Sequence, residues 1–371
     1  MKTLASLLFV LAFSTPAFAQ LTCAAWPQWN TFKTHFISPK GRVIDLGSEY
    51  DITTSEGQSY ALFFALVAND QASFDTLLEW TEVNLSEGDL STRLPAWKWG
   101  IKEGEGKILD SNPASDSDLW IAYALSQAAK LWQDRRYAVL SSVLAERIIR
   151  EETAQLPKLG ITLLPGPNGF KDENTWKLNP SYAPLFILKQ FAELYPHSPW
   201  QQLHDNSANM LISTAAKGFS PDWVNYNAEQ GFFHDKHAPA LGSYNAIRVY
   251  LWASLMAEDA PYKSALMKQL TPMVEHIVSS GKVPLETQTV TGKVSGTGPI
   301  GFGAALLPFL AAENASQSIT ALQQQMMMDT GFISSRYYDS VLYLFGTSAL
   351  NKRFSIDKNG ELITNWSAEC Q

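Results

Sequence analysis

The feature that most constrains the fold is a long succession of helical patterns joined by short loops. Apolar residues recur at helical spacing, as at Phe74, Leu77 and Leu85, which would line one face of a helix. Strand signals are limited to 289–294 and 354–362, and no linker, charge block or exact repeat divides the chain. We therefore expect one all-α domain. The predicted helices are 26–36, 58–68, 71–85, 116–132, 137–150, 180–194, 197–216, 242–257, 260–279, 299–312, 315–328 and 335–346.

The number of predicted helices suggests how they are arranged. Six antiparallel pairs closed into a ring would account for all twelve segments. An α-solenoid or an irregular bundle would satisfy the same periodicity, so the pattern alone leaves all three architectures open. The composition is 46% hydrophobic, which is ample for a core in any of them.

The N-terminus predicts export. Lys2 precedes an apolar run at 4–13, and an Ala-x-Ala ending closes at Ala19, so residues 1–19 are interpreted as a signal peptide rather than a core helix. This run is too short to span a bilayer, and no later run is long enough. We expect residues 20–371 to form a single soluble domain, located in the periplasm or secreted.

The chain has two cysteines, Cys23 and Cys370, near opposite ends. In an exported protein this arrangement predicts a disulfide. Such a bond would close a very long loop, for which the chain-entropy model gives a stabilisation of about 4–5 kcal/mol. Two free thiols are one alternative. A lipid anchor on Cys23 is another, although Gln20-Leu21-Thr22 is a poor lipobox.

Charge and motifs exclude several function classes. The formal charge of -8 becomes -9 once Lys2 is removed with the signal peptide, which argues against nucleic-acid binding. His234 and His237 lack a third zinc ligand nearby, and there is no Gly-x-Ser-x-Gly elbow. The glycine-containing turn at 295–298 lacks the lysine of a phosphate loop. We expect neither a metal nor a cofactor.

Three segments carry candidate catalytic residues. Glu56 opens an apolar helix, where it would ordinarily serve the helix N-terminus, but partial desolvation would raise its pKa and suit a general acid. Asp116 and Asp118 lie at the start of another helix. They could be capping groups, or one of them could face a cavity; a calcium loop is the third interpretation, but the segment has too few ligands for it. The segment that contains Asn245 and Arg248 indicates, by itself, only an ordinary helix start.

Aromatic residues near Pro, Asn and Asp in loops suggest a groove. Flat aromatic faces with polar edges match the apolar faces and hydroxyl rims of sugar rings. We expect substrate contacts from Trp97, Trp99, Trp120, Trp176, Tyr182, Trp223, Tyr244 and Arg248.

Together these segments resemble glycoside hydrolase family 8, in particular the branch encoded with bacterial cellulose synthases. The likeness runs from Val43 to Cys370, and Glu56 matches the family's general acid. The family's signature matches Ala114, Ser115, Asp116, Ser117, Asp118, Ile121, Ala122 and Trp132, with Ser117 departing from the usual small residue.

The resemblance implies a fold and an activity. The fold would be an (α/α)6 barrel of six inner and six outer helices. The activity would be that of an inverting endo-β-1,4-glucanase acting on cellulose during its biosynthesis. Glu56 would protonate the leaving oxygen and Asp116 would hold the distorted sugar, although older descriptions make it the nucleophile. Inversion requires about 6.5–9.5 Å between acid and base. The implied partners are β-1,4-glucan chains and, loosely, the synthase machinery; we expect a monomer.

One position departs from the family pattern. Asn245 stands where the base aspartate is expected, and an amide cannot accept a proton from water at neutral pH. Asp222 and Asp235 are the nearest alternative bases by sequence. Otherwise the chain is an inactivated copy or a weak enzyme that mainly binds glucan. A polysaccharide lyase on the same helical ring is a third hypothesis.

Overall fold

Helices form the frame of the computed structural model, which describes residues 25–234, 240–329 and 331–366. The predicted signal peptide, Cys23, Cys370 and Asp235 lie outside these residues. The described helices are α1 (Pro27–Phe36), α2 (Ser55–Val67), α3 (Gln71–Leu85), α4 (Ser115–Leu131), α5 (Arg135–Glu151), the 3-10 helix η1 (Pro180–Tyr182), α6 (Leu185–Leu194), α7 (Trp200–Thr214), α8 (Ile247–Leu255), α9 (Lys263–Ser280), α10 (Ile300–Ala312), α11 (Ser316–Met328), α12 (Phe332–Ser335) and α13 (Tyr337–Leu350).

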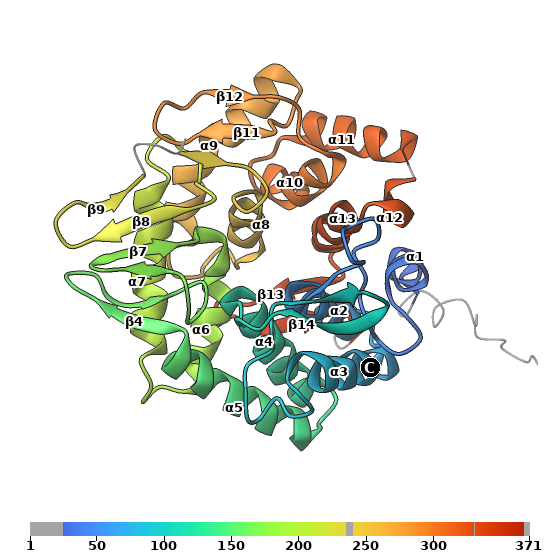
Figure 1. Ribbon diagram of the computed structural model, residues 1–371. Helices are drawn as coiled ribbons and strands as arrows, with labels where there is room; N and C mark the ends of the chain where they lie inside the picture. The colour runs from blue at the N-terminus through green and yellow to red at the C-terminus, as the bar shows by residue number, and fades with distance from the viewer. Residues whose placement is uncertain (1–24, 235–239, 330, 367–371) are drawn as a thin grey trace, which may run out of the picture.

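The helices form two concentric layers, as the ring-shaped prediction requires. Each of α2, α4, α6, α8, α10 and α13 contacts its neighbour in that order, and they form the inner layer (Figure 1). The outer helices α3, α5, α7, α9 and α11 pack against α2, α4, α6, α8 and α10, while α1 and α12 pack against α13. The architecture is therefore an (α/α)6 barrel, and neither an α-solenoid nor an irregular bundle.

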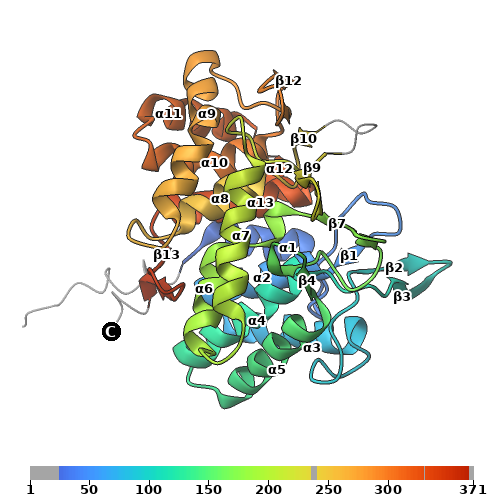
Figure 2. The same ribbon diagram turned by 90° about the vertical axis from the view of Figure 1, so that its left-hand side faces the viewer.

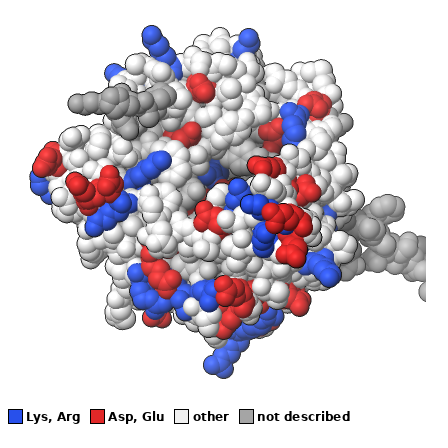
Figure 3. Space-filling model, in the orientation of Figure 1, with Lys and Arg blue, Asp and Glu red and all other residues white. Residues whose placement is uncertain are grey.

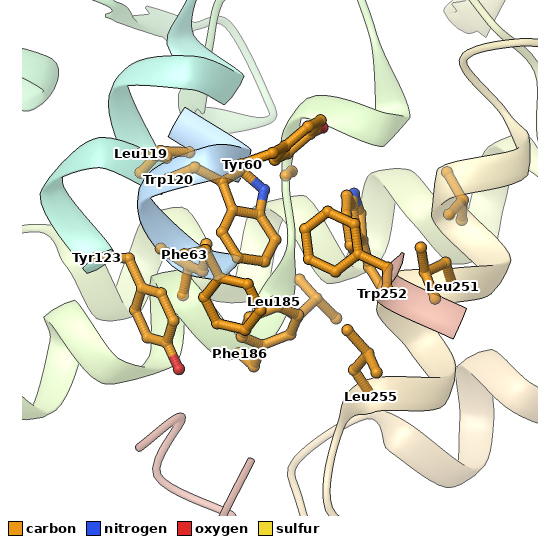
Figure 4. Close-up of a cluster of buried hydrophobic side chains, with 14 of the residues drawn as sticks. Tyr60, Phe63, Leu119, Trp120, Tyr123, Leu185, Phe186, Leu251, Trp252 and Leu255 are labelled. Atoms are coloured by element: carbon orange, nitrogen blue, oxygen red, sulfur yellow. The ribbon is translucent and has the colours of Figure 1, made fainter. Parts of the chain in front are cut away.

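Aromatic side chains close the ring. Phe63 of α2 stacks on Phe345 of α13 with ring centroids 5.5 Å apart, which joins the first inner helix to the last. Trp120 of α4 lies 5.7 Å from Phe186 of α6 and 5.0 Å from Trp252 of α8. Figure 4 shows Phe63, Trp120, Phe186 and Trp252 converging from different helices. Centroid separations of this size are those at which aromatic pairs attract each other, so the rings hold the inner layer together.

The inner helices differ from the outer ones in sequence pattern, and burial explains the difference. Every residue of α2 except Glu56 is buried, and α10 is buried over nearly its whole length. A helix surrounded by protein has no solvent face and needs no polar stripe. The outer helix α5 is instead amphipathic: Tyr137, Leu144 and Ile148 are buried while charged residues face outward. The outer helices can therefore be recognised from the spacing of their apolar residues, whereas the inner helices lack such a pattern.

Short strands gather mainly at one end of the barrel. In the side view, β2, β3, β7, β9, β10 and β12 project to one side, whereas β13 lies on the other (Figure 2). We refer to the strand-rich end as the loop face. The described strands are β1 (Thr53–Thr54), β2 (Lys98–Lys102), β3 (Glu105–Asp110), β4 (Thr153–Leu156), β5 (Gly160–Leu163), β6 (Lys171–Asp172), β7 (Thr175–Leu178), β8 (Val224–Asn227), β9 (Gly231–Phe233), β10 (Leu241–Gly242), β11 (Glu286–Gln288), β12 (Val294–Ser295), β13 (Phe354–Ile356) and β14 (Leu362–Thr364).

All the described sheets are small and antiparallel. Their strand orders are β1-β2-β3, β4-β5, β6-β7-β8-β9, β10-β11-β12 and β13-β14. In the four-stranded sheet Trp176 pairs with Tyr226, and in the first sheet Thr53 pairs with Trp99. The sheets therefore join loops that are distant in the sequence.

Some predicted boundaries were wrong. The helix predicted at 180–194 is split, because Pro184 lacks an N–H and disfavours helical backbone before it. The helix predicted at 242–257 begins only at Ile247, after a turn. The hairpin at 354–362 is confirmed, whereas 289–294 is mostly the turn between β11 and β12. The remaining hairpins were missed because their strands are short and lack alternation.

The ends of the described chain meet at Arg353. Its Nη2 donates to the backbone oxygen of Ala25 at 2.8 Å, and its own carbonyl accepts from the N–H of Asn365 at 2.9 Å. No helix in the described part of the chain is long and apolar enough to cross a membrane.

The contact between α10 and α13 gives a stability prediction. A β-carbon on Gly346 would lie 1.8 Å from the backbone oxygen of Ala304. Alanine is intrinsically the better helix former, yet Gly346→Ala should lower the free energy of unfolding by about 1–3 kcal/mol through overpacking. Gly303→Ala is the matched control, because its β-carbon would meet only a movable methyl of Leu322 at 3.1 Å. Denaturant unfolding measures both, and equal stability of the two variants would contradict this packing.

Candidate active site

Inner helices begin at the loop face, and their first turns meet there. Glu56 lies in the first turn of α2, Asp116 in that of α4, and Arg248 is the second residue of α8. Ser181 comes from η1, immediately before α6. The ring therefore brings together side chains separated by more than a hundred residues in the sequence.

Arg248 is the centre of this cluster. It is 3% exposed, and its Nη1 binds a carboxylate oxygen of Glu56, the hydroxyl of Tyr60 at 3.0 Å and Oδ2 of Asp116 at 3.3 Å. Its Nη2 donates to Oγ of Ser181 at 3.1 Å. A buried charge requires such compensation, and the fixed fork of a guanidinium can serve several oxygens at once. Taken alone, the local sequence had indicated only an ordinary helix start here, whereas the family resemblance had placed Arg248 at the site.

The start of α2 fixes Glu56. Thr54 caps the helix by accepting the N–H of Gly57 at 3.0 Å, a standard N-cap contact. Gly57 has no room for a side chain, because a β-carbon there would lie 2.6 Å from the hydroxyl of Tyr337. The Glu56 side chain is 23% exposed and paired with Arg248. It is therefore only partly exposed and is ion-paired, and the ion pair is a feature that the local sequence had not indicated.

Asp116 is more deeply placed. It is 3% exposed, and its Oδ1 accepts the backbone N–H of Ser117 at 2.8 Å. The pKa of Asp116 is raised to about 7, because the loss of hydration on burial outweighs the attraction of Arg248 and the nearby charge of Glu56 acts in the same direction as burial. Near neutral pH this carboxyl group is therefore able to hold or release a proton.

Asn245 belongs to the same cluster. Its Oδ1 accepts from Nη2 of Arg248 at 2.9 Å and from Nδ2 of Asn179 at 3.2 Å. Asn179 is fixed in turn, because its Oδ1 accepts the N–H of Ser181 at 3.0 Å. Asn245 thus lies beside Arg248, as the family pattern implied, and its oxygen has two donors.

Asp222, one of the two alternative bases, holds the turn before α8 through one of its two carboxylate oxygens. Its Oδ1 accepts three backbone N–H groups, from Ser243 at 2.9 Å, Asn245 at 3.0 Å and Ala246 at 2.7 Å. One carboxylate oxygen therefore holds the turn that carries Asn245. Asp235, the other alternative base, lies outside the described residues.

Three of the predicted aromatic residues are at least partly exposed at the loop face. Trp223 is half-buried and stacks on Phe170 with an interplanar angle of 9°, while Lys177 lies 4.7 Å from its ring centre. Tyr182 lies 6.1 Å from Trp223, and Tyr244 is 52% exposed. These rings come from different loops and helix starts at the loop face.

Other predicted contact residues differ in exposure. Trp120 and Trp176 are only 1% and 5% exposed, and Trp120 packs among the rings of the core, so neither has a free face for a sugar. Trp97 and Trp99 are half-buried. Arg42 lies 4.4 Å from the ring centre of Trp99, which therefore already has a partner on its face.

Sequence reasoning missed four polar members of the site. Tyr60 and Ser181 bind Arg248, Asn179 binds Asn245, and Tyr338 donates to the backbone oxygen of Tyr244 at 2.7 Å. Only Tyr60 carried a local signal, since it follows Glu56 by one helical turn. The others come from separate loops, and only the folded ring brings them together.

The arrangement suits acid–base chemistry on a bound neutral polymer. Figure 3 shows that the loop face is hollowed near its centre, where acidic and basic side chains both reach the surface. The described residues contain no group of three side chains suited to hold a metal ion. A cavity of about 490 Å³ between α9 and α11 is lined by residues such as Val278 and Leu322 and lies outside the charged cluster.

Known proteins are similar to this chain in sequence and in fold. The model of Glycosyl hydrolases family 8 matches residues 3–352. An endoglucanase of Escherichia coli O157:H7 is 43% identical over 368 residues, covering 99% of this chain and 97% of that protein. The crystal structure of endo-1,4-D-glucanase from Vibrio fischeri ES114 has a TM-score of 0.89 at 43% identity, covering 92% of this chain and 99% of the other. Endoglucanase Cel10 of Klebsiella pneumoniae has a TM-score of 0.69 at 27% identity, covering 88% and 99%.

The central cation gives a prediction for stability. Arg248→Leu should lower the free energy of unfolding by about 3–5 kcal/mol near pH 7, because it leaves buried carboxyl groups without their counter-charge. The loss should be smaller near pH 5, where Asp116 is protonated. Thermal unfolding at the two pH values measures this.

Arg150→Leu is the control for that experiment. Arg150 lies on α5 and binds Glu151 at the surface, so its removal should leave unfolding nearly unchanged. If the two variants were equally stable at both pH values, the proposed role of Arg248 would be excluded.

Proposed function

The chain belongs to the glycosyl hydrolases family 8, and on that premise we propose that it is an inverting endo-β-1,4-glucanase. The observation that carries the proposal is the cluster in which Arg248 binds Glu56 and Asp116 at the loop face. Endoglucanases 43% identical over nearly the whole chain support the same substrate class.

Glu56 is proposed as the general acid. Its carboxyl group is partly exposed, so a glycosidic oxygen can reach it, and it faces the interior of the cluster. A general acid must give its proton to the leaving oxygen as the bond to the anomeric carbon breaks. Arg248 fixes the carboxyl group, and its hydrogen bonds to Tyr60 and Ser181 keep the guanidinium in place.

Asp116 is proposed to hold the sugar at the cleavage point. Its protonated form can donate a hydrogen bond and its ionised form can accept one, and a pKa of about 7 makes both forms accessible. Hydrogen bonds to a distorted sugar strengthen toward the transition state, which is how such a residue contributes to the rate. The aromatic rings of Trp223, Tyr182 and Tyr244 would supply stacking on either side.

The base is the open position of this mechanism. Asn245 cannot take a proton from water, and Oδ1 of Asp222 is occupied by three N–H groups. This supports a second candidate function, a glucan-binding form whose hydrolysis is slow. In both cases the cleft, the acid and the sugar contacts are the same, and only the rate differs.

We propose that the protein acts on glucan chains during cellulose biosynthesis, in the periplasm or outside the cell, as a monomer loosely associated with the synthase. The signal-like residues 1–19 support export. The Cys23–Cys370 disulfide is part of this proposal, and Arg353 supports it, because Ala25 and Asn365 both bind that residue.

Removing the acid should abolish hydrolysis while preserving binding. Glu56→Gln keeps the size of the side chain and its hydrogen bond to Arg248. Its amide group is not acidic, however, and cannot transfer a proton to the leaving oxygen. Turnover of carboxymethylcellulose should fall by about 10²–10⁴-fold, whereas affinity for cello-oligosaccharides should change by no more than a few-fold. Reducing-end release and calorimetry measure the two. Full turnover in this variant would remove Glu56 from the mechanism.

Restoring the base should accelerate hydrolysis. Asn245→Asp preserves an oxygen for the donors Arg248 and Asn179 and adds a second oxygen that can accept a proton from water. Turnover should rise by at least about 10²-fold, with the α-anomer as the first product by proton NMR.

Affinity distinguishes the two candidate functions in that experiment. The unaltered chain should bind cello-oligosaccharides as tightly as the Asp variant, because stacking does not require the base. If the unaltered chain already hydrolyses glucan as fast as Asn245→Asp, the base is another residue and Asn245 has no such role.

A further inference from the structure

Beneath the proposed site lies a second pair of acids that the mechanism does not use. Asp118 and Glu152 are both completely buried, one in the first turn of α4 and the other directly after α5. Within the described residues, neither carboxyl group accepts a hydrogen bond from a backbone N–H or from the side chain of a donor residue such as Ser, Asn or Arg. The two carboxyl groups instead act on each other, since each lies close enough to the other to shift its pKa.

Two carboxylates cannot form such a contact while both are ionised. A hydrogen bond between them requires a proton on one, and like charges buried together would repel strongly. The other titratable groups that act on the pair are Asp116 on α4 and Glu151 on α5, and both are acids. Among the described residues no positive charge is placed to compensate the pair, and one shared proton lowers its buried charge from two to one and turns the repulsion into a hydrogen bond.

Helix geometry connects this pair to the site. Residues two apart on a helix project to nearly opposite sides, so Asp116 faces Arg248 while Asp118 faces the outer layer. The backbone oxygen of Glu152 accepts the N–H of Leu164 at 2.8 Å. The next residue, Pro165, accepts the N–H of Ser115 at 3.0 Å.

These contacts make a closed circuit. It runs from Asp118 to Glu152 through their side chains, from Glu152 to Leu164 through the backbone, and from Pro165 back to α4 at Ser115. Asp116 lies between the two points at which the circuit holds α4. We propose that Asp118 and Glu152 share a proton and act as positioning residues that orient Asp116 toward Arg248.

The shared proton has a consequence for stability that does not depend on hydrolysis. Burial raises the pKa of Asp118 and of Glu152 well above their ordinary values. Between the ordinary values near 4 and the raised ones, the folded chain keeps a proton that the unfolded chain has lost. Rising pH therefore favours unfolding across this window.

The first experiment removes the proton without removing the hydrogen bond. In Glu152→Gln an amide N–H takes the place of the shared proton and cannot dissociate. The slope of unfolding free energy against pH reports how many more protons the folded state binds than the unfolded state. From about pH 5 to pH 7 that number should be smaller by about one in Glu152→Gln than in the unaltered chain. Glu146→Gln is the matched control, since Glu146 lies near the end of α5 at the surface and should keep the original slope. An unchanged slope in Glu152→Gln would overturn the inference.

The second experiment tests positioning and rests on the proposed function. Glu152→Ala should lower kcat by about 10-fold or more with KM changed less than about 3-fold, because small misplacements of a catalytic group are costly. Glu152→Gln should restore kcat to within about 2-fold.

Rates are compared in the unaltered chain and in the Asn245→Asp background, so that slow turnover caused by Asn245 is recognised separately. A kcat for Glu152→Ala equal to that of the parent chain would overturn the positioning role. The pH slope reports on the shared proton even if neither parent hydrolyses glucan.

Discussion

The structure depends on one buried cation. Arg248 lies where the first turns of several inner helices meet, and it is the only positive charge that contacts both Glu56 and Asp116 within the described residues. The convergent helix N-termini favour negative charge, and the carboxylates in turn need a counter-charge once water is excluded. The helix ring, the acids and the cation therefore require one another. The same arrangement that allows the ring to close gives the site its chemistry.

Much of this could be predicted from the sequence. The period of segments such as 71–85 revealed the outer helices, and the number of helices suggested a ring. The positions of Glu56, Asp116 and Arg248 followed from resemblance to a family, and the structure brings all three together. Periodicity could not select the ring, because it describes a helix and not its neighbours. Contacts such as Phe63 with Phe345 decide that, and they join distant parts of the chain.

The errors have physical causes as well. Trp120 and Trp223 both stand near polar residues in the sequence, yet one packs in the core and the other faces a loop. Local composition does not show which way a ring points. The role of Asp222 was equally hidden, because its three partners are backbone N–H groups about twenty residues away. Almost any residue type can supply a backbone N–H, so the sequence does not show which residues bind Asp222.

Closure of the barrel has a consequence for how the chain matures. The first inner helix, α2, is completed by the last, α13, and Glu56 meets its cation 192 residues later in the chain. A chain emerging from its N-terminus therefore shows its large apolar helices well before their final neighbours exist. Contacts this distant in sequence form late and slowly. A chain that ends before α13 lacks Phe345, the ring that joins the last inner helix to the first, so the frame around the site is complete only once α13 is present.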